Sequence, residues 1–545
     1  MTNKMNKGKS NDLRLNKVEY LKKIITAIYV LTILGIFPLV FRDYYFDILV
    51  FKYRFYVIVT IIFLFIIFVL NIILKVHDVS LPEGKYLSCL WRKIKLLSLP
   101  ECFLLIFILI SVLSTIQSDF KYEAFWGNEG RYTGCFLLLL YGFSTIAVSR
   151  IFSFKTWTIE VFLITGMVIC LFGVTDYFQM DILKFKVNMH PDQYNIFAST
   201  IGNVNSYTSY VAMVMAVSTI LFSKERTGWK VALYYVYMII SFFAIVMGLS
   251  DNSYLALGAI FAFLPLYIFD TKTGIKRYVL ILVSFSMVIY IMKMINSTMS
   301  GRVMEMEGIL QKLTSFSGLE YVIIGMISLG VLTYAVAYIT RSKGEELGSR
   351  WRVMWLIVIL IMTILLVIAL YDVNILKHEG RYGDLGSYLI FNDEWGTRRG
   401  YAWRITLENY SSFPLVHKIF GYGPDTFGIL TRFNNYKEML DRYGETFDSV
   451  HNEYLQYFIT MGPVSLISYV GFLVSSGIYM VKRLKESSYV MAVFFALLCF
   501  AIQAIVNISV PVVSPVMFTL LAAGLAGARS VSNESDFGLL NIKHL

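Results

Sequence analysis

The stretch YVIVTIIFLFIIFVLNIIL, residues 56–74, decides the fold class of this chain. It contains no charged residue, and as a helix rising about 1.5 Å per residue it covers the roughly 30 Å thickness of a bilayer's hydrocarbon core. Such a segment predicts a transmembrane helix, because inside lipid a helix satisfies its backbone hydrogen bonds within one segment.

Similar apolar runs recur along almost the whole sequence. Hydrophobic residues make up 57% of the chain and charged residues only 16%, against about 25% charged in ordinary soluble domains. We therefore predict an all-α integral membrane protein with about fourteen transmembrane helices, twelve being the alternative count. The predicted spans are residues 24–41, 56–74, 102–116, 134–148, 161–178, 207–222, 231–249, 254–269, 278–292, 321–340, 353–370, 455–481, 489–508 and 511–526.

The distribution of basic residues predicts the orientation. Residues 1–23 are strongly basic, and with this terminus in the cytoplasm most Lys and Arg residues fall in cytoplasmic segments, as the positive-inside rule requires. Both termini are then cytoplasmic, and the net charge of +11 needs no nucleic-acid partner. No Lys or Arg falls inside a predicted span, which argues against a transporter, because transporters use buried charges as relays.

The chain divides into five predicted regions. They are a basic cytoplasmic N-terminus (1–23), eleven spans (24–370), an extracytoplasmic loop with short helices (371–453), three further spans (454–528) and a cytoplasmic tail (529–545). A loop of that length is normally functional or forms a small domain. The cysteines have no disulfide or metal-site spacing, and Cys89 is expected in a cytoplasmic loop, so we predict no metal site.

The long loop contains a predicted helix, GTRRGYAWRITLENYSSFP (396–414), which ends at its proline. An arginine heads the apolar and aromatic face of this helix. The face consists of Arg399, Trp403, Leu407 and Tyr410. A glycine-rich turn, GYGPDTFG (421–428), and an amphipathic stretch, YKEMLDRYG (436–444), then return the chain to the membrane at His451. We expect this loop to form a lid or a pocket wall.

Each polar candidate in these segments also has a purely structural interpretation. A lone histidine at a helix start, such as His451, is more often a hydrogen-bonded structural residue than a catalyst. Arg404 and Glu408 can pair on a helix surface, and Asn203 and Asn205 can cap the span that follows them. Aromatic and basic residues next to a span often anchor it at the lipid headgroups. The candidates for that anchoring role are Trp126, Arg131 and Trp403.

Six short motifs, taken in their order, carry a resemblance to a known family. They are WGNEGRYTG (126–134), STIGNVNSYTSYVAM (199–213), LSDNSYLALGA (249–259), RGYAW (399–403), GYGPDTF (421–427) and HNEYLQYFITMGPVS (451–465). With a long outer loop before the last spans, this order resembles the O-antigen ligase and polymerase family of bacterial membrane glycosyltransferases. The resemblance covers residues 125–469, and it rests on the order of the motifs, since no single one is specific.

The resemblance implies a GT-C-like fold in the bacterial cytoplasmic membrane and an inverting glycosyltransferase that needs neither a metal nor a cofactor. Its substrates would be a glycan on an undecaprenyl diphosphate carrier and the acceptor hydroxyl of a glycan, lipid or protein at the outer face. The leaving lipid diphosphate needs positive charge, which arginines supply without a metal. The expected diphosphate-binding residues are, in order of preference, Arg399, Arg131 and Arg404.

His451 is the expected catalytic base, because a histidine with a pKa near about 6.5 can accept the proton of the acceptor hydroxyl near neutral pH. Aromatic and amide side chains in the same motifs are expected to bind the substrate. They are Trp126, Asn203, Trp403, Tyr422 and Asn452. Which of the neighbouring residues Arg398 and Arg399 faces the diphosphate stays open.

Three alternatives stay open at the level of function. Ligase and polymerase share the motifs, and we lean slightly to polymerisation or transfer of a surface polysaccharide. A flippase for lipid-linked oligosaccharides also has fourteen spans, but it predicts an internal repeat, short outer loops and a polar central cavity, none of which is visible in the sequence. A membrane scaffold for polysaccharide assembly would need neither His451 nor the arginines.

Overall fold

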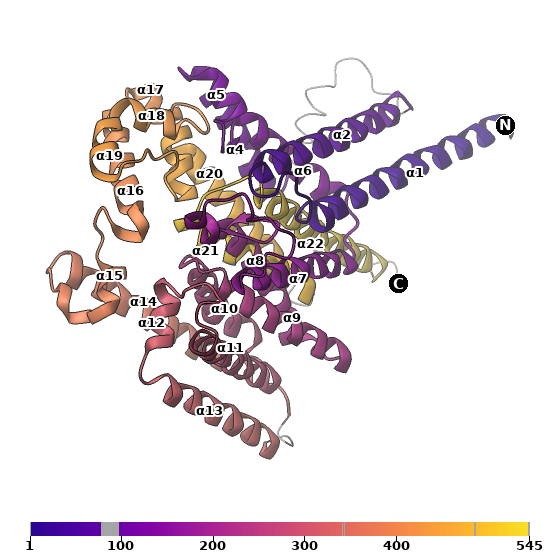
Figure 1. The fold of residues 1–545 in the computed structure, drawn as a ribbon. Helices are drawn as coiled ribbons and strands as arrows, with labels where there is room; N and C mark the ends of the chain where they lie inside the picture. The colour runs from indigo at the N-terminus through magenta and orange to yellow at the C-terminus, as the bar shows by residue number, and fades with distance from the viewer. Residues whose placement is uncertain (1, 78–96, 341, 343, 484–486, 543–545) are drawn as a thin grey trace.

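The computed structural model describes residues 2–77, 97–340, 342, 344–483 and 487–542, and Figure 1 shows their fold. The predicted loop position of Cys89 lies outside these residues. The described chain is largely helical, and its only sheet is an antiparallel ribbon of two short strands, β1 (Phe197–Ala198) and β2 (Gly202–Asn203). The all-α membrane fold predicted from the sequence is confirmed.

Each of the fourteen predicted spans overlaps one long helix. In order, these helices are α1 (Thr2–Leu31), α2 (Ile48–His77), α4 (Leu99–Gln117), α6 (Cys135–Ile151), α7 (Trp157–Tyr177), α8 (Val204–Lys224), α9 (Gly228–Met247), α10 (Ser253–Ile268), α11 (Lys272–Thr298), α13 (Leu319–Ile339), α14 (Arg350–Asn374), α20 (Glu453–Arg483), α21 (Ser488–Gln503) and α22 (Ser514–Ile542). Within the described residues, ten helices are long and apolar enough to cross a membrane, and α6 and α10 are shorter apolar helices. The other two predicted spans overlap α1, which continues as the π-helix η1 (Thr32–Ile36), and α22.

Helix α8 forms the centre of the bundle, because nearly all of its side chains are buried. It packs against α7, α9, α10 and α21, and small residues allow the close approach. At Gly173 of α7, an added Cβ would lie 2.1 Å from the hydroxyl of Tyr207, so only glycine fits there. By contrast, α13 and α14 expose most of their apolar side chains, as helices at a lipid-facing edge do.

Helix α2 begins at Ile48, before the predicted span of residues 56–74, and this extension takes in two basic residues, Lys52 and Arg54. The Nζ of this buried lysine donates to the carbonyl oxygens of Phe37, at 3.2 Å, and Pro38, at 2.7 Å. These carbonyls follow the end of η1 and need donors. Several membrane helices are longer than the predicted spans, so the prediction that no basic residue lies in a span fails near their ends, for example at Lys52 and Arg54 of α2 and at Lys293 of α11. Lys52 caps the end of η1.

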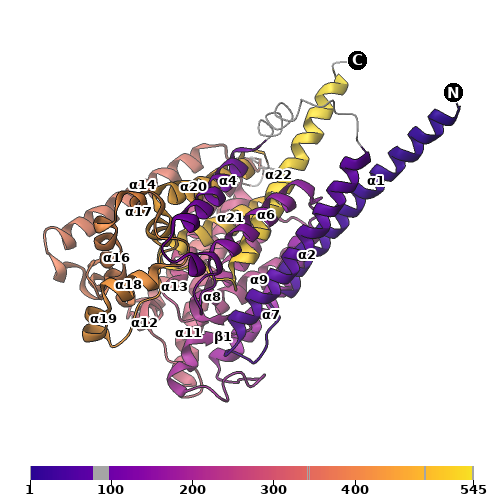
Figure 2. The same cartoon turned by 90° about the horizontal axis from the view of Figure 1, so that it is seen from above.

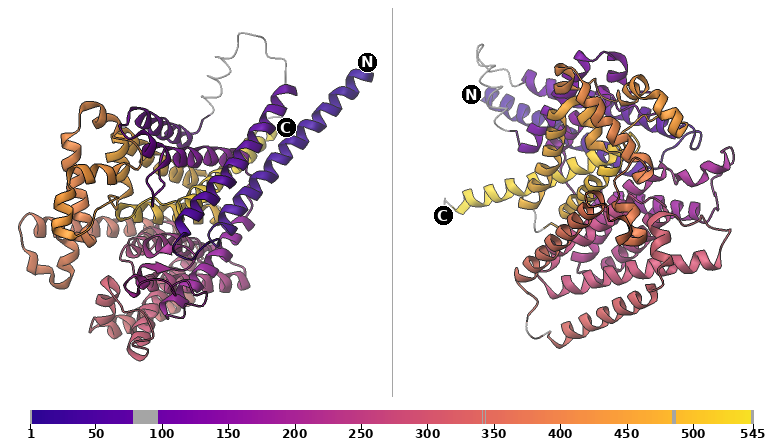
Figure 3. Two further views of the ribbon diagram at one scale, coloured as in Figure 1. Left: turned by 45° about the horizontal axis from the view of Figure 1, so that its top comes forward. Right: turned by 90° about the vertical axis from the view of Figure 1, so that its left-hand side faces the viewer.

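The long segment between α14 and α20 folds into a helical lobe, residues 375–452. Its elements are η4 (Glu379–Leu385), α15 (Gly386–Leu389), α16 (Trp395–Ser412), α17 (Leu415–Phe420), α18 (Phe427–Asn434) and α19 (Tyr436–Tyr443). The lobe has a small apolar core of its own, made of Tyr401, Ile405, Phe413, Phe427, Leu430, Met439 and Val450 together with Ile459 of α20. Figures 2 and 3 show that the first part of α1 and the last part of α22 extend on the same side of the bundle, away from this lobe.

Contacts with α4 and α20 join the lobe to the membrane helices. Gln117, at the end of α4, donates from Nε2 to the carbonyl oxygen of Gly421, at 2.5 Å. Helix α20 breaks at Gly462, which has a φ of 80° and precedes Pro463. A Cβ at this glycine would lie 1.9 Å from the carbonyl oxygen of Ile419 in α17. The break therefore lets α17 pack directly against α20 and fixes the lobe beside the bundle.

Candidate active site

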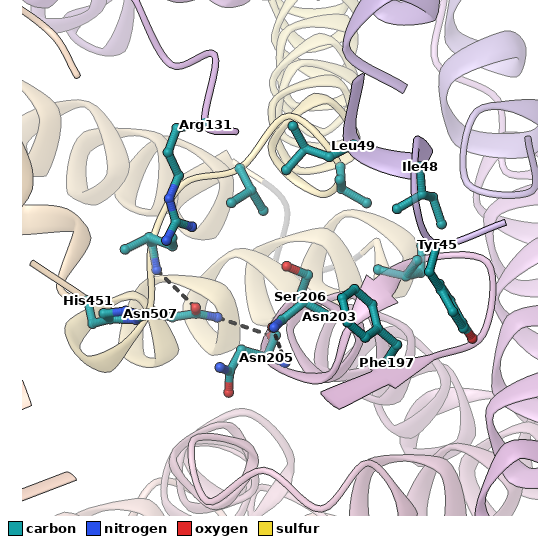
Figure 4. Close-up of a pocket in the computed structure, with 14 residues that line it drawn as sticks. Tyr45, Ile48, Leu49, Arg131, Phe197, Asn203, Asn205, Ser206, His451 and Asn507 are labelled. Atoms are coloured by element: carbon teal, nitrogen blue, oxygen red, sulfur yellow. Dashed lines mark hydrogen bonds between the residues drawn. The ribbon is translucent and has the colours of Figure 1, made fainter. Parts of the chain in front are cut away.

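A cavity of about 300 Å³ lies where five separate segments of the chain meet (Figure 4). Its lining residues are Tyr45, Ile48, Leu49, Arg131, Phe197, Ile201, Asn203, Asn205, Ser206, His451, Asn507, Ile508, Val510 and Val512. Aliphatic and aromatic side chains form much of the wall, and an arginine, a histidine and several amides form the rest. Three of the predicted site residues, Arg131, Asn203 and His451, are thus brought together.

The backbone next to His451 is held by hydrogen bonds from side chains. The Nε1 of Trp403 in α16 donates to the carbonyl oxygen of Val450, at 3.1 Å, and the amide of Val450 donates to Oε1 of Gln456, at 3.0 Å. His451 itself has a φ of 52°, in the left-handed region that non-glycine residues rarely adopt. A strained residue held in place by its neighbours is a frequent feature of functional sites.

The ring of His451 is half-buried and faces charges of both signs. Burial lowers its pKa, the positive charges of Arg399 and Arg131 lower it further, and the carboxylate of Asp448 partly opposes them, leaving a pKa of about 4. The imidazole is therefore neutral near pH 7. A neutral imidazole has one ring nitrogen that can accept a proton.

Arg131 reaches the cavity from the loop before α6 and forms a two-point ion pair with Asp448. Its Nη2 lies 2.7 Å from Oδ1 and its Nε lies 3.0 Å from Oδ2 of that carboxylate. The loop is fixed from behind by Asp425, a buried residue that sequence analysis did not single out. Its Oδ2 accepts hydrogen bonds from the amides of Asn128, at 2.7 Å, and Thr133, at 3.1 Å. Asp425 lies in the GYGPDTF motif, so this contact joins two of the six motifs.

Arg399 begins the regular part of α16 and forms no ion pair with a described residue. Its Nη1 donates to the carbonyl oxygen of Gly396, at 2.6 Å, and its Nε is buried without an acceptor. The charge of this guanidinium acts on His451 and on Asp251. An arginine held near a cavity without a carboxylate partner can bind an anionic ligand.

The neighbouring Arg398 has a different environment. Its Nη1 lies 2.5 Å from Oε1 of Glu445, and its guanidinium lies 5.0 Å from the centre of the Tyr443 ring. Three consecutive left-handed residues, Gly396 to Arg398, precede Arg399, so Arg398 belongs to this turn and Arg399 to the regular helix. Such a turn is costly for the non-glycine residues. It separates the paired Arg398 from the unpaired Arg399.

Arg404, the third predicted diphosphate ligand, is already neutralised by three carboxylates. Its guanidinium nitrogens lie 3.0 Å from Asp393, 2.9 Å from Glu408 and 2.8 Å from Glu438. Arg442 pairs with two of the same acids, Asp393 and Glu438. This network holds α16 and α19 together inside the helical lobe. It leaves Arg404 little capacity for a further anion, so the arrangement does not favour a diphosphate-binding role.

Part of the chain matches a known protein family. Residues 315–470 match the O-antigen ligase family. The match covers less than a third of the chain. The matched range contains α13, α14, the helical lobe and the first part of α20, and so includes Arg399 and His451. A search of curated proteins finds no match. The comparison supports a membrane protein of the O-antigen ligase and polymerase type, with a glycosyltransferase-like activity.

The aromatic residues predicted to bind substrate do not line the cavity. Trp126, at the end of α5 (Lys121–Trp126), packs on Phe125 and Phe136, with ring centres 4.8 and 5.1 Å away. Tyr422 stacks on His417, with ring centres 3.7 Å apart. Trp403 holds the carbonyl of Val450, as described above. In the matched segment and in the loop before α6, these rings support the framework of the site.

The two predicted asparagines cap helices. The side-chain oxygen of Asn203 accepts from the amide of Asn205 at the start of α8. The side-chain oxygen of Asn452 accepts from the amides of Tyr454 and Leu455 at the start of α20, both at 3.0 Å. Asn203 still lines the cavity, whereas Asn452 does not. The cap at Asn452 sets the direction of the chain immediately after His451.

Sequence analysis missed one polar wall of the cavity. Asn507 lies between the last two long helices. Its Nδ2 donates to the carbonyl oxygen of Asn205, at 3.1 Å (Figure 4), and to Oγ of Ser209, at 2.8 Å. The Oδ1 of Asn205 accepts from Ser250 and Asn252 in turn. Asn507 lies outside the six motifs and outside the matched O-antigen ligase range. A buried-facing amide in an otherwise apolar sequence, NISVPVVS (507–514), is the signal that could have found it.

Proposed function

We propose that this protein is an O-antigen ligase-like glycosyltransferase, which moves a glycan from an undecaprenyl diphosphate carrier to an acceptor hydroxyl at the outer face of the bacterial cytoplasmic membrane. One observation carries the proposal: His451 and Arg131 meet at one cavity, and the charge of Arg399 acts on the same imidazole. A neutral base and two cations around one reacting bond match the needs of this transfer.

His451 is the proposed base. As the acceptor oxygen attacks the anomeric carbon, its proton passes to the free ring nitrogen, and the bond from the anomeric carbon to the diphosphate oxygen breaks. This single displacement inverts the configuration at the anomeric carbon. A ring with a pKa of about 4 is a weak base. The negative charge of an arriving diphosphate offsets the two arginines and raises the pKa of His451, so donor binding strengthens the base.

Arg399 and Arg131 are the proposed ligands of the diphosphate. Arg399 has no carboxylate partner among the described residues, and its buried Nε needs an acceptor that a phosphate oxygen would supply. Arg131 shares its charge with Asp448 but lines the cavity. Two guanidinium groups can stabilise the charge that develops on the leaving lipid diphosphate, so the proposed reaction needs no metal. Arg404 is not a proposed diphosphate ligand, because its guanidinium forms ion pairs with three carboxylates of the lobe.

The rest of the cavity suits the other parts of such a donor. Aliphatic side chains from the start of α2 and from the segment before α22 offer a surface for the first isoprene units of the carrier. They are Ile48, Leu49, Val510 and Val512. Asn203, Asn205 and Asn507 offer amide groups for sugar hydroxyls. These assignments depend on the roles proposed for His451 and the arginines.

The proposed orientation follows the basic residues. With residues 1–23 and 529–545 in the cytoplasm, the cavity and the loop of residues 371–453 face the outside. The first part of α1 and the last part of α22 extend on the same side, away from the lobe, which supports this arrangement (Figure 2). The acceptor is then another surface molecule or a second lipid-linked repeat unit, and we favour polymerisation or transfer of a surface polysaccharide.

The deciding experiment supplies purified protein in lipid with one undecaprenyl diphosphate-linked repeat unit and no other acceptor, and measures the length distribution of the products. His451→Ala is run alongside. A ladder of lengthening glycans that the variant does not make supports a polymerase with His451 as its base. A ligase would instead leave the donor unextended until an acceptor is added. A flippase or scaffold would give no glycan transfer under either condition.

A further inference from the structure

A second pocket, of about 320 Å³, lies where α7, α9 and α21 begin. Its chemistry-bearing lining residues are Trp157, Glu160, Trp229, Lys230, Tyr234 and Tyr489. The first cavity lies at the other end of these helices. Its residue Asn507 follows the end of α21, whereas the second pocket lies at the start of α21. Its residue Asn203 precedes α8, and the far end of α8 connects to the start of α9, where the second pocket lies. The two sites are thus separated by the length of a membrane-spanning helix, about 30 Å.

Glu160 is held inside this pocket by two tyrosines. Its Oε1 accepts hydrogen bonds from the hydroxyls of Tyr234 and Tyr489, the latter at 2.9 Å, and these two hydroxyls lie 3.0 Å from each other. Its Oε2 accepts no hydrogen bond from a described residue. Three different helices therefore orient one carboxylate, with one oxygen free to accept hydrogen bonds from a bound group. An oriented carboxylate surrounded by aromatic rings is a good site for an ammonium group.

Lys230 supplies the opposite charge in the same pocket. Its Nζ forms no ion pair with a described residue and lies 5.7 Å from the centre of the Trp229 ring. The positive charge of Lys230 contributes to a lowered pKa of the nearby Glu225, although the two groups are too far apart to form an ion pair. A lysine at the end of a membrane helix is well placed to bind a phosphate of the lipid surface. The pocket thus holds an available cation and a free carboxylate oxygen.

Two tryptophans place this pocket at the level of the lipid headgroups. Trp157 is 40% exposed and Trp229 is 66% exposed, and each stands at or next to the first residue of its apolar helix. Tryptophan is enriched at that depth of a membrane, where an apolar ring meets a wet surface. A ligand in the pocket would therefore have its polar part beside Glu160 and Lys230 and an apolar part in the adjoining lipid.

We propose that this pocket binds a phospholipid headgroup that carries both a phosphate and a primary ammonium, as in phosphatidylethanolamine. The ammonium donates hydrogen bonds to Oε2 of Glu160, and the phosphate pairs with Lys230. A purely anionic headgroup would leave Glu160 facing negative charge without compensation. The proposal concerns binding alone and does not depend on the proposed transfer reaction, since the site lies at the opposite end of the helices.

The test measures lipid binding by native mass spectrometry of the full chain in detergent. Dioleoyl phosphatidylethanolamine and dioleoyl phosphatidylglycerol are titrated separately. We expect the first to bind about tenfold more tightly, the effect of one charge-assisted hydrogen bond. Equal affinities would overturn the proposal. Competition by free phosphoethanolamine at the same concentration would overturn the lipid assignment in favour of a soluble ligand.

Two variants assign the preference to the pocket. Glu160→Gln keeps an oxygen that accepts from both tyrosines and is expected to remove the preference for the ammonium lipid. Lys230→Gln, at a half-buried position near the surface, is expected to weaken binding of both lipids. A preserved preference in Glu160→Gln, or unchanged binding in Lys230→Gln, would refute the site. The exposed residues Glu305 and Lys155 provide the matched controls, Glu305→Gln and Lys155→Gln, which should bind like the unchanged protein.

Discussion

Arg131 and Asp448 form a two-point ion pair, with Nη2 2.7 Å from Oδ1 and Nε 3.0 Å from Oδ2. The pair joins the loop before α6 to the segment that ends at His451. It has two electrostatic consequences for the proposed base. Asp448 raises the pKa of His451, whereas Arg131 lowers it. The carboxylate thus orients one cation of the cavity and moderates its effect on the ring.

Replacing this carboxylate should affect the chemistry more than donor binding. In Asp448→Asn the pKa of His451 falls further, because the carboxylate that raises it has lost its charge. A weaker base should lower kcat by about tenfold. The KM for the lipid-linked donor should not rise, since Arg131 becomes free to bind diphosphate. Steady-state kinetics on both quantities checks this split. Asp441→Asn, in an exposed part of α19, is the matched control, and an equal kcat loss there would contradict the argument.

The two neighbouring arginines should differ sharply in their effect on activity. Arg399→Gln removes an unpaired cation near the proposed base and should lower kcat/KM by about 10² to 10³, as loss of a charge-stabilising donor does. Arg398→Gln removes a surface ion pair to Glu445 and should change activity little, with a loss in stability of at most about 1 kcal/mol. Rates per folded protein, measured on both variants, test this. A larger loss in Arg398→Gln would reverse the assignment.

Arg404 should matter for the stability of the helical lobe. Arg404→Gln leaves Asp393 and Glu438 with less positive charge around them and should lower the free energy of unfolding by about 1 to 2 kcal/mol, given the partial exposure of the group. The rate per folded protein should stay near that of the unchanged chain. Thermal unfolding and activity are measured together. Glu408→Gln, which removes only the pair on the helix surface, should cost about 0.3 to 0.5 kcal/mol. A large kcat loss in folded Arg404→Gln would restore its predicted role.

The membrane helices could be predicted because the signal for them is local. Each span is an apolar run whose length matches the bilayer, so neighbouring residues alone determine it. Sequence analysis did not place Lys52 in a membrane helix, because its position depends on contacts that are not local in the sequence. Its burial depends on the carbonyls of Phe37 and Pro38, which the turn after η1 brings back against α2. From the sequence alone, a basic residue at the edge of an apolar run is taken as the end of the membrane helix. Only the folded structure shows the carbonyl groups that allow such a residue to be buried within the helix.

The candidate site was only partly predictable, again for a spatial reason. Arg131 and His451 were singled out from motifs, and they line one cavity. Arg404 was chosen by residue type, but whether an arginine is free depends on partners elsewhere in the chain, here Asp393 and Glu438. Asn507 was missed, since its segment follows the last motif and meets the cavity only in the folded chain. Residue type suggests a chemical role, and packing decides whether the side chain is available for it.

The proposed use of arginines makes a prediction about metals. Because Arg399 and Arg131 supply the positive charge for the leaving diphosphate, treatment with EDTA should leave the transfer rate unchanged. Assays with and without the chelator, followed by addition of Mg²⁺ or Mn²⁺, provide the measurement. A strict requirement for either cation would overturn this part of the mechanism. Arg399→Gln in the same assay shows whether an added cation can replace the guanidinium.

The pH dependence of the reaction tests the environment of His451 directly. In the free protein this ring has a pKa of about 4, so the acid limb of kcat/KM should appear near that pH, well below the ordinary value for histidine. Activity is lost as the pH falls, because protonation removes the lone pair that accepts the acceptor's proton. The acid limb of kcat should lie at higher pH, since the bound diphosphate offsets Arg399 and Arg131 and raises the pKa. Full pH profiles of both quantities check the order of the two limbs. The exposed residue His190 provides a control, because His190→Gln should leave both pH profiles unchanged. If the acid limb of kcat/KM in the unchanged protein lay at the ordinary histidine pKa, the ring of His451 would not be held between the two arginines.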